Sequence, residues 1–165
     1  MLTLVSDFGQ FCLLFAFCLA CYAAVGSFLG GAIGHRRLVE TAENSVIAMS
    51  ILVTLTVFSL WYQLLSNNFN LQFVAQNSSR AMPWYYKFGA LWGGQEGSLV
   101  FWCWILCIYA FITVMQNRKR NRHLMPYVVG VIAIVAGFFL LLNNFVANPF
   151  DQIGVIRAGA AATPF

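Results

Sequence analysis

The chain has 165 residues, of which 61% are hydrophobic and only 8% charged, and its formal net charge is +4. A soluble domain carries roughly 25% charged residues, so this chain lacks the polar surface needed to cover a water-soluble globule. The composition therefore excludes a soluble domain and predicts an integral membrane protein.

Four apolar segments are long enough to cross a bilayer, at residues 11–33, 45–65, 98–115 and 125–147. A spanning helix needs about 20 mostly apolar residues, because the hydrocarbon core is about 30 Å thick and each residue rises about 1.5 Å. The runs are continuously apolar rather than alternating, which favours helices over the strands of a barrel. We therefore predict an all-α, polytopic bundle with about four transmembrane helices.

The first segment predicts a retained membrane helix rather than a signal peptide. A signal peptide needs a positively charged start, and no Lys or Arg precedes Arg36. The segment ends in a glycine-rich stretch in which Gly26, Gly30 and Gly34 recur every four residues. Small residues at this spacing let helices approach closely in membranes, so we expect this face to pack against another helix.

The orientation of the bundle follows from two basic loops. They hold His35, Arg36 and Arg37 after the first segment, and Arg118, Lys119, Arg120, Arg122 and His123 after the third. Short loops rich in Lys and Arg stay on the cytoplasmic side, or on the matrix side in an organelle. The N-terminus, the 66–97 loop and the tail at 152–165 should then lie on the opposite side. This topology explains the charge without a nucleic-acid partner.

The long 66–97 loop between the second and third segments is the distinctive part of the chain. Loops beyond roughly 12–15 residues are usually functional or disordered, and this one lacks the composition of disorder. An aromatic belt at the membrane interface would explain its rings without a ligand. Aromatic faces with nearby cations also suit a flat macrocycle that carries carboxylates. The rings in the loop are Phe69, Phe73, Trp84, Tyr85, Tyr86, Phe88 and Trp92.

A candidate surface for such a macrocycle or a partner combines this loop with the start of the third segment. Glycines at 93, 94 and 97 permit a tight turn with close backbone approach. Glu96 either caps the helix or has a functional role, and the sequence leaves both open. The complete set is Arg80, Trp84, Tyr85, Lys87, Trp92, Gly93, Gly94, Gln95, Glu96, Gly97, Ser98 and Trp102.

At this loop the sequence resembles the cytochrome c maturation protein F family, the CcmF/CcsA/NrfE-type haem-handling proteins. The resemblance runs from about residue 30 to 151 and is carried by residues 73–78, 83–87, 90–99, Trp102 and 137–150. It implies that residues 1–151 form a haem-handling region, the N-terminal section of a membrane haem lyase. That section would take part in presenting haem to apocytochrome c on the periplasmic or intermembrane side.

The resemblance also implies a cofactor, partners and a location. The cofactor is haem b, held transiently and shared with a C-terminal part or a separate chain that carries the ligating histidines. The partners are a haem chaperone, apocytochrome c and thiol-reducing maturation components, with membrane lipid around the spans. The location is the bacterial inner membrane, or the mitochondrial inner membrane in an organelle.

The sequence assigns no catalytic residue and no metal site, so at most the chain is part of a haem lyase assembly. Its own histidines, His35 and His123, are expected on the cytoplasmic side, away from the aromatic loop. Gln95 stands where the family usually has histidine, which removes a titratable, metal-binding nitrogen. The alternative function is a structural membrane subunit of a respiratory or transport complex with no haem role of its own.

Overall fold

The computed structural model describes residues 2–66, 71–77, 83–89, 91 and 94–151. The helices in chain order are α1 (Leu2–Ile33), α2 (Arg36–Leu65), α3 (Gln72–Asn77), α4 (Trp84–Gly89), α5 (Gln95–Asn117) and α6 (Met125–Phe145). Four of them, α1, α2, α5 and α6, are long and apolar enough to cross a membrane. The predicted all-α bundle with four candidate spans is confirmed.

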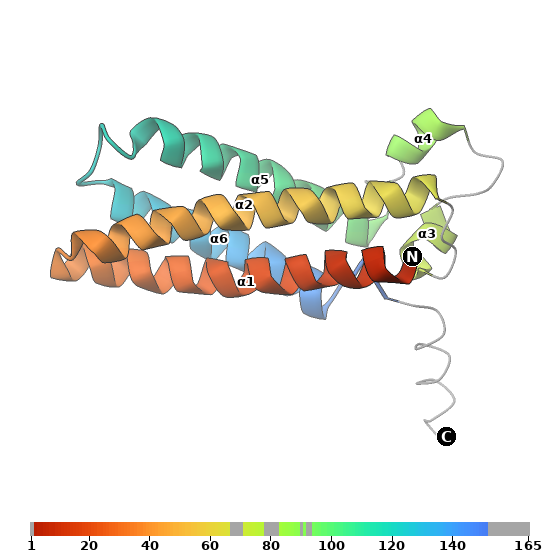
Figure 1. Cartoon of the computed structure of the whole chain (residues 1–165), viewed down its shortest axis with the longest axis horizontal. Helices are drawn as coiled ribbons and strands as arrows, with labels where there is room; N and C mark the ends of the chain where they lie inside the picture. The colour runs from red at the N-terminus through yellow and green to blue at the C-terminus, as the bar shows by residue number, and fades with distance from the viewer. Residues whose placement is uncertain (1, 67–70, 78–82, 90, 92–93, 152–165) are drawn as a thin grey trace, which may run out of the picture.

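The four long helices lie side by side and alternate in direction (Figure 1). α1 packs on α2 and α6, and α5 packs on the same two helices, so the order around the bundle is α1, α2, α5, α6. The α1–α2 and α5–α6 turns lie together at one end, called here the basic end (residues 34–43 and 117–127). The start of α1, α3, α4 and the segment after α6 lie at the other, the aromatic end (described residues among 2–9, 60–101 and 146–151).

The first two helices are longer than the apolar segments that predicted them. α1 has 32 residues and begins at Leu2, and α2 has 30 residues and begins at Arg36. At about 1.5 Å per residue each is roughly 45–48 Å long, well above the hydrocarbon thickness of about 30 Å. Hydropathy marks where a side chain must leave the hydrocarbon, whereas the helical backbone continues into the polar layer.

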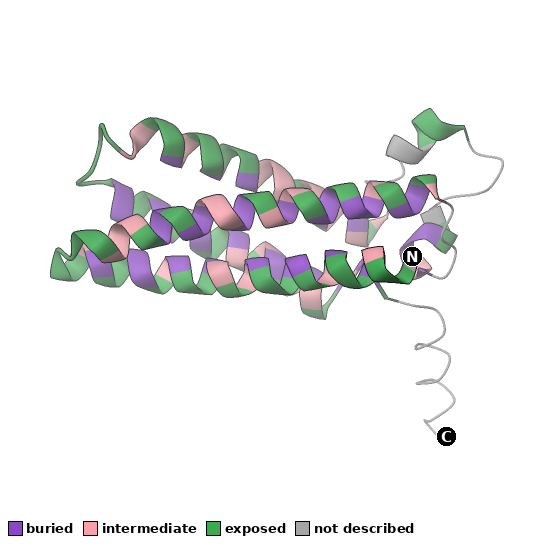
Figure 2. Ribbon diagram, in the orientation of Figure 1, coloured by how far each residue is buried: buried purple, intermediate pink, exposed green. Residues whose placement is uncertain are grey.

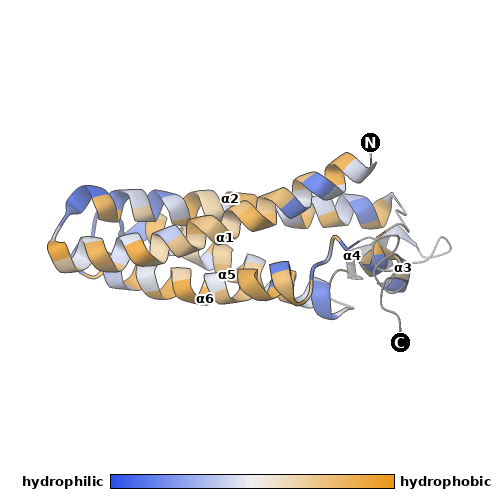
Figure 3. Ribbon diagram, turned by 90° about the horizontal axis from the view of Figure 1, so that it is seen from below, coloured by the Kyte–Doolittle hydropathy of each residue, from blue (hydrophilic) through white to orange (hydrophobic). Residues whose placement is uncertain are grey.

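Each long helix buries a stripe of small or aliphatic side chains and leaves the opposite stripe exposed (Figure 2). The exposed stripes are themselves largely apolar (Figure 3). Lipid tails are as apolar as these side chains, so helix association depends on close packing rather than on the hydrophobic effect. Small residues supply that packing, among them the buried Ala16, Ala20, Ala23, Ala42, Ala110, Ala133 and Ala136.

The glycine-rich end of α1 packs closely on α2, as its spacing predicts. A Cβ added at Gly26 would lie 3.7 Å from Ala42 Cβ, and one at Gly30 would lie 2.9 Å from Val39 Cγ2. Gly34 has a φ of +71°, the left-handed conformation that favours glycine after a helix. The His35 N–H donates to the Gly30 carbonyl oxygen at 3.0 Å, which closes α1 at the basic end.

Hydrogen bonds between helices fix the register of α2 against its neighbours. The Ser50 hydroxyl is shared between the Val46 carbonyl oxygen of its own helix at 2.8 Å and the Cys107 carbonyl oxygen of α5 at 3.0 Å. The Trp104 indole N–H donates to Thr54 Oγ1 at 3.1 Å. The Ser59 hydroxyl donates to the Val5 carbonyl oxygen at 2.8 Å. Such side-chain bonds between membrane helices contribute about 0.6 kcal/mol each on average. Together they set which residues meet at the two ends of the bundle.

Candidate functional site

Part of the long connection at the aromatic end folds onto the bundle. Phe73 and Val74 of α3 are buried together with Leu71 and Leu91 against apolar side chains of α2 and α5. Phe73 is only 1% exposed. Phe73 therefore packs inside the protein rather than in an exposed aromatic belt. The connection also contains the short helices α3 and α4 rather than loop alone.

Gly97 lies where this buried cluster meets the first turn of α5. A Cβ at Gly97 would collide with the Leu91 carbonyl oxygen and would lie 2.6 Å from Phe73 Cζ. Only glycine fits there without movement of the backbone of the connection. Close approach, predicted for this glycine, is thus observed between two parts of the protein itself.

Gly94 is the residue before α5, and its dihedral angles do not require glycine. Its φ of −114° and ψ of 165° are extended values that any residue adopts. Its carbonyl oxygen accepts a hydrogen bond from the Ser98 N–H at 3.0 Å, which starts the helix. Glu96 lies in the first turn, where a negative charge favours the positive end of the helix dipole. This position is compatible with capping and with a functional role.

Three rings of α4 form an exposed group, the α4 patch (Trp84, Tyr85 and Tyr86). Trp84 is 68% exposed, and its ring centre lies 5.9 Å from that of Tyr85 in an edge-on arrangement. The Tyr85 and Tyr86 ring centres are 4.8 Å apart. α4 packs on α2, which holds the patch at the aromatic end of the bundle (Figure 1). The patch offers broad apolar faces with hydroxyl groups beside them.

The remaining predicted site residues fall into two groups. On α5, Gln95 and Trp102 are exposed, while Ser98 is partly buried. The structure therefore places the α4 patch and the start of α5 on separate elements at the same end. Outside the described residues lie Arg80, Trp92 and Gly93, together with the side chain of Lys87.

The aromatic end offers faces for stacking against a flat ring, and its described residues include no histidine. Haem iron usually takes a His, Cys, Met or Tyr ligand. The two histidines of the chain are at the basic end: His35 precedes α2, and His123 lies in the α5–α6 turn. A histidine ligand for a haem at the aromatic end would therefore have to come from outside these residues.

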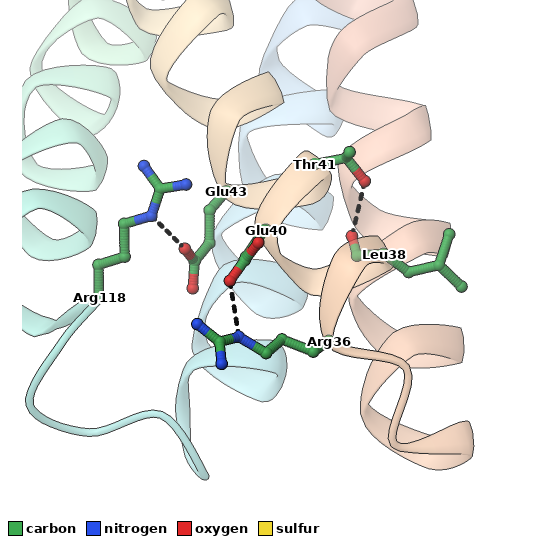
Figure 4. Close-up of polar contacts among 6 residues, drawn as sticks. All are labelled: Arg36, Leu38, Glu40, Thr41, Glu43 and Arg118. Atoms are coloured by element: carbon green, nitrogen blue, oxygen red, sulfur yellow. Dashed lines mark hydrogen bonds and ion pairs between the residues drawn. The ribbon is translucent and has the colours of Figure 1, made fainter.

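The sequence analysis missed an ion pair at the basic end. Arg118 Nε lies 2.9 Å from Glu43 Oε2, and Glu43 is only 3% exposed (Figure 4). Arg36 Nε lies 2.8 Å from Glu40 Oε1 in a second, more exposed pair. The available signal was the spacing of Glu40 and Glu43, which places both on one face of a helix.

No model of a protein family matches the chain. The cytochrome c-type biogenesis protein CcmF of Pseudomonas fluorescens is 30% identical over 149 residues, covering 90% of this chain and 23% of that protein. CcmF of Haemophilus influenzae is 25% identical over 149 residues, with the same coverage. The probable NrfE of Escherichia coli is 30% identical over 108 residues, which is 66% of this chain and 20% of that protein.

A solved structure of a cytochrome c haem lyase CcmF has the same fold, with a TM-score of 0.83 at 22% identity. The match covers 89% of this chain and 25% of that one. The chain thus spans about a quarter of the length of the relatives it matches, in their N-terminal part. By sequence and fold, it is a homologue of the N-terminal part of the cytochrome c-type biogenesis proteins CcmF and NrfE.

Proposed function

We propose that this chain acts in cytochrome c biogenesis as the N-terminal section of a membrane haem lyase. In that role it takes part in presenting haem to apocytochrome c. The observation that carries the proposal is a similarity to CcmF proteins that extends over 90% of the chain and includes the fold of the bundle. The remaining parts of the lyase, including histidine ligands for haem b, would come from a longer chain or a separate partner.

The aromatic end would face the periplasm, and the basic end the cytoplasm, of a bacterial inner membrane. Four of the five residues of the α5–α6 turn from 118 to 122 are Lys or Arg. Such turns are retained on the cytoplasmic side. This orientation puts the α4 patch on the side where apocytochrome c is exported and matured, and where a haem chaperone and thiol-reducing components would meet it.

Within the aromatic end, we assign the contact surface to the α4 patch and the first turn of α5. The patch is exposed on α4, which packs on α2, and Phe73 and Leu91 pack around Gly97 at the start of α5. Rings held in place in this way contact a flat ligand or a partner with little loss of side-chain freedom. An aromatic contact of this kind contributes about 0.5–1.5 kcal/mol beyond its buried area.

Tyr85 and Tyr109 provide a matched test of this assignment. Both are exposed tyrosines, at 56% and 65%, but Tyr85 lies in the α4 patch and Tyr109 on the flank of α5. In a strain that depends on this chain, Tyr85→Ala should lower haem-stained cytochrome c about two- to tenfold, in line with one lost aromatic contact. Tyr109→Ala should leave it unchanged, and immunoblots should show both variants at normal levels in the membrane.

Normal cytochrome c with Tyr85→Ala would make the patch an interfacial belt and would favour the structural-subunit alternative. Trp92→Ala extends the test to the predicted residue outside the described set and should behave like Tyr85→Ala. Gly94→Val tests the start of α5. Because the dihedral angles of Gly94 accept a side chain, this variant should reach the membrane normally. It should lower cytochrome c because the added side chain obstructs the contact surface.

A further inference from the structure

A cavity of about 520 Å³ opens at the basic end, between the turns that join α1 to α2 and α5 to α6. Its charged lining comes from the α5–α6 turn and from the first turns of α2. The positive residues are Arg36, Arg118, Lys119 and Arg122, and the negative ones are Glu40 and Glu43. With His123 neutral, four positive and two negative charges leave the lining at +2.

The two carboxylates in the lining are already paired. Glu40 lies against Arg36 at 2.8 Å, and Glu43 lies against Arg118 at 2.9 Å (Figure 4). No ion pair with a carboxylate is formed by Lys119 or Arg122 among the described residues. The excess charge of the cavity therefore resides on these two side chains, and the complementary ligand is an anion.

The other walls of the cavity are apolar. Gly31 and Pro126 meet so closely that a Cβ on the glycine would lie 2.9 Å from Pro126 Cβ, and Tyr127 lies beside them. Next to lining residues in the sequence are Ile33, 69% exposed, and Leu124, 60% exposed. A small inorganic anion would satisfy the cations but would make no use of this apolar rim.

The cavity also lies at the depth of the lipid headgroups. The first apolar segment ends at residue 33 and the last begins at residue 125, so the hydrocarbon layer begins where the lining changes from charged to apolar. Basic pockets between membrane helices on the cytoplasmic side are suited to phospholipid headgroups. Lys and Arg form short, charge-assisted hydrogen bonds with phosphate oxygens.

We propose that this cavity binds the headgroup of an anionic phospholipid. Its phosphate would lie against Lys119 and Arg122, and its acyl chains would run past Ile33 and Leu124 along the exposed apolar faces of α1 and α6. The site is at the opposite end from the α4 patch. The lipid site therefore does not depend on the proposed role in cytochrome c biogenesis.

The test uses the full 165-residue chain in detergent, titrated with phosphatidylglycerol or phosphatidylcholine of identical acyl chains and followed by native mass spectrometry. Phosphatidylglycerol should bind with the lower Kd. The variant Lys119→Gln/Arg122→Gln should raise that Kd about 30-fold, since each cation near an anionic lipid contributes about fivefold. Binding of phosphatidylcholine should not change.

The matched control is Arg37→Gln/Arg120→Gln, which removes the same charge at the same end from exposed residues that do not line the cavity. It should change the Kd for phosphatidylglycerol less than twofold. If both double variants raise the Kd for phosphatidylglycerol equally, binding depends on general surface charge and not on this cavity. Equal binding of the two lipids, or displacement of phosphatidylglycerol by millimolar inorganic phosphate, would overturn the assignment to a phospholipid.

Discussion

The basic end of the bundle has hydrophilic residues at its two short turns (Figure 3), whereas the aromatic end carries the exposed rings of the α4 patch. At the basic end, Arg36 and Arg118 extend from helix ends and pair with acids one or two turns into α2. At the aromatic end, shape comes from buried apolar contacts around Phe73 and Gly97. Charged turns are enough to orient the bundle in the membrane. A contact surface of defined shape also needs buried apolar contacts beneath it.

The sharpest test of this comparison is the side of the membrane on which each end lies. Gln76→Cys and His123→Cys place a thiol at exposed positions of the aromatic and basic ends. In intact spheroplasts, a membrane-impermeant maleimide should label the first fully and the second only after lysis. Wild-type protein measures the background from its five native cysteines. The reverse pattern would invert the proposed topology.

A smaller but still large effect is expected from Gly97→Ala. The added Cβ meets the Leu91 carbonyl oxygen, which is backbone and cannot rotate away. Overpacking of this kind costs typically 1–3 kcal/mol, and we expect a loss of about 3 kcal/mol in the free energy of unfolding in detergent. Gly89→Ala is the control, because no atom of the described residues lies within 4 Å of its added Cβ. Equal stability of the two variants would mean that the connection is not built around Gly97.

The ion pairs of the basic end should differ from one another in their contribution. Glu43→Gln leaves Arg118 without its partner in a buried setting, although the Arg118 side chain is 35% exposed and partly solvated. We expect a loss of about 1–2 kcal/mol in unfolding free energy, below the 3–5 kcal/mol of a fully buried pair. Glu40→Gln should leave the thermal unfolding midpoint unchanged, because that pair is solvated. If Glu40→Gln proves the more damaging, the burial difference does not determine stability here.

Much of the fold follows from the sequence because membrane insertion depends on local composition. The four apolar segments each predict one long helix, since a backbone in hydrocarbon must satisfy its own hydrogen bonds. The recurrence of Gly26 and Gly30 likewise predicts close packing on another helix, which the structure shows to be α2. The resemblance to haem-handling proteins depends on an ordered string of residues and needs no knowledge of their positions in space.

Composition could not predict which residues of the same type in one loop are buried and which are exposed. Phe73 and Trp84 are both aromatic, yet Phe73 is buried in one cluster with Leu91 while Trp84 is exposed on α4. Their difference depends on which neighbours the folded connection brings close. The pairing of Glu43 with Arg118 likewise depends on the register of α2 against α5, which distant hydrogen bonds such as that from Ser50 help to set. Hydropathy along the chain determined the helices, but contacts between residues far apart in sequence decided which side chains form each end, because burial and pairing depend on position in space.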